Sequence, residues 1–134
     1  MTAKTFHLGD ILSVTTGRLV SPRRMGGVLD ILTWMTGERP AAHQIPRVTR
    51  ECRDPLLAQH PDLAAITRPT FTDPPGGRGA AVARWLAEQV AAYGETREVE
   101  PLDPADHTRI DPVTEALRCN PDMEVIIMET PEEL

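Results

Sequence analysis

Apolar residues recur at helical spacing in several stretches of the chain, most clearly between residues 21 and 37. The members of this stripe are Met25, Val28, Leu29, Leu32 and Met35, and they follow the 3.6-residue period of one helix face. Ser21 is a good N-cap, Pro22 suits the first helical position, and Gly37 can end the helix. The pattern therefore predicts a helix that begins at Ser21 and ends before Gly37.

Four residues of this helix do not fit a simple amphipathic pattern. Ile31 and Trp34 lie off the main stripe, so the helix is either buried on both faces or has one face open to a partner, as in a dimer. We expect burial of both faces in a chain this short. Gly26 and Gly27 each weaken a helix by about 1 kcal/mol relative to Ala, so we expect a backbone or a ligand to approach closely there, with close packing as the commoner reason.

The segments on either side predict shorter elements. A short strand around Phe6 should lead into a helical turn or two, with Asp10 as N-cap and Gly17 as the stop. Prolines at positions 40, 46, 55 and 61 should keep any helices between residues 38 and 65 short, and Asp54-Pro55 fits the start of a new helix.

From Ile66 onward, strand-like and helix-like patterns alternate. They predict a strand at 66–72, a DPPGGRG loop, a helix at 80–93 ended by Gly94, a strand at 98–102, a short helix from Asp111-Pro112 and a buried strand at 123–128. This order predicts an α+β fold with N-terminal helices followed by a small sheet that has helices packed against it.

Composition indicates one domain spanning residues 1–134. We divide it into a mainly helical, basic part (1–65), an alternating, acidic part (66–129) and a tail (130–134). The 13 prolines and five aromatic residues predict a loop-rich fold with an aliphatic core. Cys52 and Cys119 have no CxxC or Cys/His spacing, which indicates reduced thiols. Without a spanning apolar run or a signal peptide, we expect a cytoplasmic protein.

The formal net charge of -6 is unevenly distributed. Residues 1–50 hold seven Lys or Arg against three Asp or Glu, a net charge of +4, which leaves -10 for the remainder. A wholly acidic protein would suggest avoidance or mimicry of nucleic acid, whereas a divided chain can pair its two halves internally. We expect internal or solvated pairing.

The stretch TTGRLVSPRR holds the first candidate site. Arg18, Arg23 and Arg24 surround a predicted helix start at Ser21, although a helix N-terminus is electropositive and favours anions. Together with the Ser21 hydroxyl and the free helix N–H groups, they could bind a phosphate or a carboxylate. Three explanations are open: solvation or internal pairing, an acidic protein partner, and a nucleic acid or nucleotide.

The second candidate is a glycine-rich connection between a predicted strand and a helix. Gly76, Gly77, Arg78 and Gly79 could cradle a phosphate on backbone N–H groups. The stretch matches neither GxGxxG nor a Walker loop, so a Pro/Gly connection is the favoured interpretation.

Catalytic and metal chemistry has little support in the sequence. His7, His43, His60 and His107 are widely spread, without HxxxH or HExxH spacing. An acid/base pair of His107 with Asp106 or Asp111, near Cys119, is conceivable, but the spacing does not require it. We therefore predict no catalytic residue, metal site or cofactor, and regard an enzyme as less expected than a binding protein.

Several segments resemble a family of small uncharacterised proteins encoded by bacteriophages and prophages. They are FHLGDILSVTTGRLVSP, LDILTWMTGE, HQIPRVTREC, LLAQHP, WLAEQVAAYGE and HTRIDPVTE. The resemblance implies an accessory protein in the cytoplasm of a bacterial host, acting through protein contacts and modulating or inhibiting a host factor such as a defence system. The alternative is a nucleotide- or nucleic-acid-binding protein that uses the Ser21 helix start or the Gly76–Gly79 loop. Homo-oligomers are open, and no membrane partner is expected.

Overall fold

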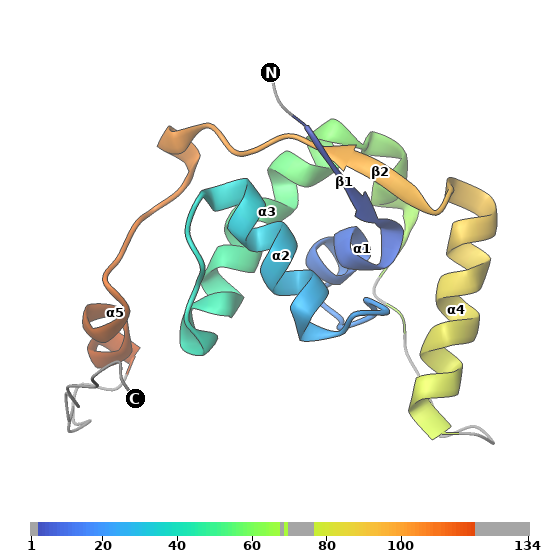
Figure 1. Ribbon diagram of the computed structural model, residues 1–134, viewed down its shortest axis with the longest axis horizontal. Helices are drawn as coiled ribbons and strands as arrows, with labels where there is room; N and C mark the ends of the chain where they lie inside the picture. Colours follow the sequence, from blue (N-terminus) through green and yellow to red (C-terminus); the bar gives the residue numbers. More distant parts are fainter. Residues whose placement is uncertain (1–2, 68, 70–76, 120–134) are drawn as a thin grey trace.

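The computed structural model describes residues 3–67, 69 and 77–119, and the side chains of 77, 78 and 119 are not part of that description. The chain forms a helix-rich α+β domain, as the sequence predicts (Figure 1). The elements in chain order are β1 (Lys4–His7), α1 (Leu8–Thr16), α2 (Met25–Thr36), η1 (Ala42–Gln44), α3 (Ile45–Gln59), η2 (Pro61–Ala65), α4 (Gly77–Tyr93), β2 (Thr96–Val99), η3 (Pro104–Asp106) and α5 (Pro112–Cys119).

The sheet joins the start of the described chain to the segment that follows α4. Strands β1 and β2 pair antiparallel, with Lys4 opposite Val99 and His7 opposite Thr96, and Figure 1 shows them side by side over the helices. The strand expected around Phe6 is confirmed. The one expected at 98–102 begins earlier and ends at Val99, because Val99 closes the pairing with β1.

The strand predicted at 66–72 is wrong for its described residues. Ile66 and Thr67 are not in a strand, since the 3-10 turn η2 reaches Ala65 and the described sheet is already formed by β1 and β2. Residues 68 and 70–72 lie outside the described residues. So do the predicted strand at 123–128 and the tail at 130–134.

Helix α1 is the centre of the fold. Every residue from Leu8 to Thr16 is buried, and the helix contacts both α2 and α3. Two of its buried hydroxyls, those of Ser13 and Thr16, donate to the carbonyl oxygens four residues earlier, at 2.8 and 2.6 Å, whereas the buried Thr15 hydroxyl has no hydrogen-bond partner among the described residues. The surrounding core is aliphatic, as composition predicts; fully buried members are Leu8, Ile11, Leu12, Ile31, Leu32, Leu56, Leu63 and Val99.

The start of α1 differs from its prediction, whereas its end does not. His7 is the N-cap, since its Nδ1 accepts from the Gly9 N–H at 2.9 Å. Asp10 lies inside the first turn with its side chain fully buried, so the prediction of Asp10 as cap was wrong. Gly17 ends the helix with a φ of 75°, in the left-handed conformation that favours glycine.

Helix α2 begins three residues later than predicted, at Met25 in place of Pro22. Residues 21–24 form a turn in which Arg24 N–H donates to the Ser21 carbonyl at 3.0 Å, and helical conformation starts at Met25. Ser21 is therefore not the N-cap. Both residues off the main stripe contact the rest of the domain: Ile31 is fully buried, and the half-buried Trp34 packs against the core and donates its Nε1–H to the Val99 carbonyl at 2.8 Å.

Helix α3 corrects the expectation of short helices between residues 38 and 65. It runs for 15 residues, with Pro46 in the first turn and Pro55 inside the helix. A proline in a helix interior is unfavourable by about 3 kcal/mol. The buried stripe of Val48, Cys52 and Leu56 spans that position, and burial of such side chains contributes about 1.5–3 kcal/mol each, so packing outweighs the penalty.

Helices α4 and α5 lie at opposite sides of the molecule (Figure 1). Both were predicted close to their observed positions. Leu86 is the one buried side chain among those described in α4. Helix α5 buries Glu115 but leaves Val113 and Leu117 at 41% and 36% exposed. Among the described residues, none of the helices combines the length and apolar character needed to cross a membrane.

Candidate functional site

The predicted anion site at Ser21 is occupied by the protein's own Asp10. Ser21 Oγ donates to Asp10 Oδ1 at 2.5 Å, and Arg23 Nη2 donates to Asp10 Oδ2 at 2.7 Å. The Ser21 hydroxyl also accepts from the Arg23 N–H at 3.0 Å. The residues chosen from the sequence therefore do hold an anion, and that anion is an internal carboxylate.

Gly27 allows the Asp10 carboxylate to lie against the first turn of α2. A Cβ at Gly27 would stand 2.2 Å from Asp10 Oδ1 and 2.3 Å from Ser21 Oγ, which no side chain tolerates. The carboxylate thus occupies the electropositive end of the helix, where a negative charge is stabilised. Close packing is confirmed for Gly27, whereas Gly26 faces open space.

Of the three arginines of TTGRLVSPRR, Arg23 contacts the internal carboxylate of Asp10. Arg23 bridges Asp10 and Asp30, with 2.6 Å between its Nη1 and Asp30 Oδ2, and hydrogen bonds to Asp10 and then to Asp30 raise the pKa of its guanidinium. Arg18 is half-buried and follows the end of α1. Arg24 is exposed, and its guanidinium has no hydrogen bond or ion pair within the described part of the chain.

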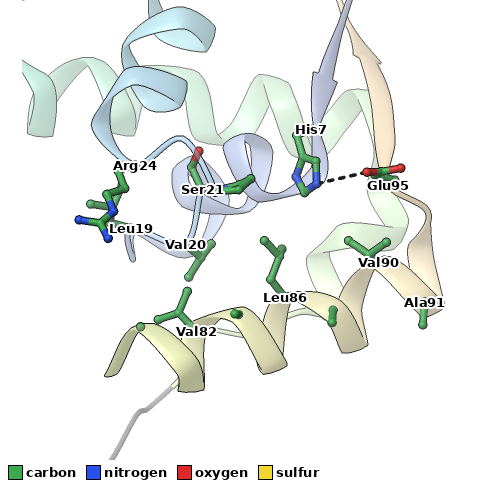
Figure 2. A pocket seen from close by; sticks show the side chains of 14 residues that line it. His7, Leu19, Val20, Ser21, Arg24, Val82, Leu86, Val90, Ala91 and Glu95 are labelled. Atoms are coloured by element: carbon green, nitrogen blue, oxygen red, sulfur yellow. Dashed lines mark ion pairs between the residues drawn. The ribbon is translucent and has the colours of Figure 1, made fainter. Parts of the chain in front are cut away.

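Arg24 stands at one end of an apolar furrow between α4 and the body of the domain (Figure 2). The furrow has a volume of about 840 Å³. One wall is α4, which contributes Gly79, Val82, Ala83, Leu86, Ala87, Val90 and Ala91; the other is the segment Leu19–Pro22 with Arg24, and His7 and Glu95 complete the lining.

Polar groups stand at the two ends of the furrow, and its walls are apolar. Figure 2 shows Arg24 beside Leu19 at one end and Glu95 at the other, with Val82 and Leu86 directed toward the body. His7 Nε2 is 3.9 Å from Glu95 Oε2. The two walls meet at Gly9, where a Cβ would lie 2.7 Å from Pro22 and 3.0 Å from Leu86.

The predicted glycine loop is largely helical. Gly77, Arg78 and Gly79 form the first turn of α4, so their prediction as a loop was wrong, and Gly76 lies outside the described residues. The helix pattern of Ala80 to Tyr93 extends back through the glycines. Gly79 faces the furrow.

A second polar cluster, missed by sequence reasoning, joins the two parts of the chain. Arg47 binds Glu51 and Glu115 at 2.7 and 2.6 Å, and His107 lies between two carboxylates, 2.6 Å from Glu51 and from Glu38. Only the Arg47–Glu51 spacing of four residues is visible in the sequence. The other partners are more than fifty positions apart, so no local pattern could identify them.

This cluster changes the assignment of the ionisable residues. The partners of His107 are Glu38 and Glu51, in place of the Asp106 or Asp111 considered from the sequence. Cys52 is fully buried, which raises its thiol pKa to about 12 and disfavours the reactive thiolate. No group of three or more His, Cys, Asp or Glu among the described residues could hold a metal ion.

Arginines of the basic part form two kinds of ion pair, one with the acidic part and one within the basic part itself. Arg47 pairs with Glu115 of the acidic part, as the expectation of internal pairing implies. Arg23, in contrast, pairs with Asp10 and Asp30 of its own part. Internal pairing thus occurs both within and between the parts.

Comparison with known proteins concerns the first half of the domain. Residues 6–66 match the model of a family described as a domain of unknown function (DUF7736). The matched segment contains α1, α2, α3 and the Asp10–Ser21–Arg23 contacts, but it ends before α4, which forms one wall of the furrow. Neither a curated protein nor a solved structure matches the chain.

Proposed function

We propose that the protein is a small accessory protein that acts by contacts with other proteins, and that the furrow along α4 is its contact surface. The observation that carries this proposal is the apolar character of a furrow of about 840 Å³. A protein helix is a common occupant of such a surface, because its apolar face replaces water along the whole length of the groove.

The exposure of α4 supports this role. Ala83, Ala87 and Ala91 line the furrow and are exposed, and Leu19 on the opposite wall is 47% exposed. Apolar surface gathered along one groove is more typical of an interaction site than scattered exposed residues are.

The alternative, binding of a nucleotide or nucleic acid, has less support. Ser21 and Arg23 already hold Asp10, so an incoming phosphate would compete with an internal carboxylate. The wall formed by α4 is also mostly alanine and valine, whereas binding of single-stranded nucleic acid usually combines basic and aromatic side chains.

The cellular location of the protein and the source of its partner also belong to the proposal. The resemblance to phage and prophage proteins supports a place in the cytoplasm of a bacterial host, where the partner would be a host or phage protein and the effect a modulation of host machinery. The family match to residues 6–66 carries no activity of its own.

The proposal is tested by photocrosslinking from the furrow. A photoreactive amino acid at Leu19 should give a discrete protein adduct in cells, and Ala87→Glu should abolish it because a charge would be placed on the apolar wall. Ala92→Glu is the matched control, since Ala92 is an exposed alanine of the same helix outside the furrow. Absence of an adduct, or its equal loss in both variants, would contradict the proposal.

A further inference from the structure

We infer that the furrow is filled by helix α4 of a second copy of this chain, which makes the protein a two-fold symmetric dimer. The inference rests on the proposed role of the furrow as a protein contact surface and names its occupant. Three features of the described residues lead to it: a row of small side chains on α4, opposite charges at the two ends of the furrow, and the direction in which α4 runs between them.

The row of small side chains permits another helix to come close. Gly79, Ala83, Ala87 and Ala91 follow one another at intervals of four and all line the furrow. Residues at this spacing form one ridge of a helix surface, and ridges of this kind interdigitate in the commonest class of helix packing. Because these side chains end at Cβ or lack it, two copies of the row can approach at the short end of the usual interaxial distance.

The charges at the furrow ends are opposite. Arg24 is exposed and its guanidinium has no ion pair within the described residues. Glu95 is 72% exposed at the other end, where its Oε2 is 3.9 Å from His7 Nε2. An occupant should therefore present a negative group near Arg24 and a positive group near Glu95.

The direction of α4 makes a second copy meet this requirement. The helix runs from Val82, on the side of Leu19 and Arg24, toward Ala91 and Glu95 at the other end (Figure 2). An antiparallel copy of α4 places its own Glu95 near Arg24 and its own Arg24 near Glu95. Two-fold symmetry then forms the pair twice, whereas a parallel copy would oppose like charges.

The backbone of Arg24 fits the same interpretation. It has a φ of 57°, the one positive φ of a non-glycine residue in the described part of the chain. Such conformations are unfavourable by about 1–3 kcal/mol for a residue with a side chain. A turn that serves only to start α2 would be better formed by glycine, so an arginine here indicates a use for its guanidinium.

Sedimentation velocity on the full chain at micromolar concentration tests the inference. We expect a species of twice the 14.8 kDa chain mass. Arg24→Glu and Glu95→Arg should each weaken the dimer about tenfold or more, because each reversal opposes like charges at both ends. The double variant should recover much of the wild-type affinity, since it restores opposite charges.

Matched controls separate specific pairing from a general effect of charge. Arg39→Glu and Glu98→Arg make the same reversals at exposed residues outside the furrow and should leave the dimer intact. A monomeric wild-type chain, or a double variant no tighter than the single ones, would overturn the inference. If the wild-type chain is monomeric but Leu19 still crosslinks to a different protein in a manner lost in Ala87→Glu, the proposed function stands and only the second copy is excluded.

Discussion

Asp10 shows how a single buried charge can determine the local conformation of its neighbours. A fully buried carboxylate is unstable without donors and a counter-charge, and residues Ser21 and Arg23 supply both. This demand explains why α2 begins at Met25: the Ser21 side chain is directed to Asp10 and not to the N–H groups of the helix. The sequence identified an anion site but could not reveal that the anion comes from a residue eleven positions away.

The contact between Asp10 and Gly27 leads to a paired prediction. Gly27→Ala should lower the free energy of unfolding by about 1–3 kcal/mol, because the new methyl group would overlap the Asp10 and Ser21 oxygens. Gly26→Ala, in the same turn but facing open space, should raise it by about 0.5–1 kcal/mol. Urea denaturation of the two variants checks both signs, and equal effects would contradict the role given to Gly27.

At the scale of elements, local patterns predicted α2, α4 and α5 but not the length of α3 or the bounds of β2. The well-predicted helices have a period, a stop residue or a proline start that acts locally. Helix α3 depends on burial of Val48, Cys52 and Leu56 against neighbours distant in sequence. The positions of the prolines alone therefore do not predict its length. The furrow likewise requires α4 and the Leu19–Pro22 segment to meet, which no local signal predicts.

Helix α5 is docked through an ion pair, and its attachment should therefore depend on pH. Hydrogen bonding from Arg47 holds the pKa of Glu115 below its ordinary value of 4.5, with Gln44 adding to the effect. The contribution of Glu115 to stability is thus fully present above pH 4.5 and is lost as the pH falls through the lowered pKa of the folded state.

Thermal melts across this range check the dependence. Glu115→Gln should lower stability at pH 7 by about 1–3 kcal/mol, since the buried pair loses its charge–charge contact. Its loss of stability between pH 6 and pH 3 should be smaller than that of the wild type. Glu98→Gln, at an exposed side chain, should keep the wild-type pH dependence; a matching change in both variants would argue against Glu115 as the source.

At the scale of the whole molecule, the later part of the chain is fastened to the early helices by His107. Its imidazole is 3% exposed and lies between Glu38, just after α2, and Glu51 in α3. Each ring nitrogen is 2.6 Å from an oxygen of one of the two carboxylates. The imidazole thus links Glu38 to Glu51 through a single ring.

Removal of this link should destabilise the fold as a whole. His107→Gln is expected to lower the free energy of unfolding by about 1–3 kcal/mol, because a single amide cannot contact both Glu38 and Glu51 as the two ring nitrogens do. His43→Gln is the control, since His43 is exposed and its ring contacts the Pro112 carbonyl oxygen, with no carboxylate within hydrogen-bond distance among the described residues. Chemical denaturation that finds the two variants equally stable would refute the fastening role of His107.

The antiparallel pairing of β1 with β2 has a consequence for how the chain folds. Helices α1, α2 and α3 are neighbours in sequence and contact one another directly. Pairing of Lys4 with Val99, in contrast, closes a loop that contains most of the described chain. Closure of so long a loop is entropically unfavourable until other contacts are in place. The helical cluster should therefore form the folding nucleus and the sheet should close afterwards, so that changes in β2 act mainly on the rate of unfolding.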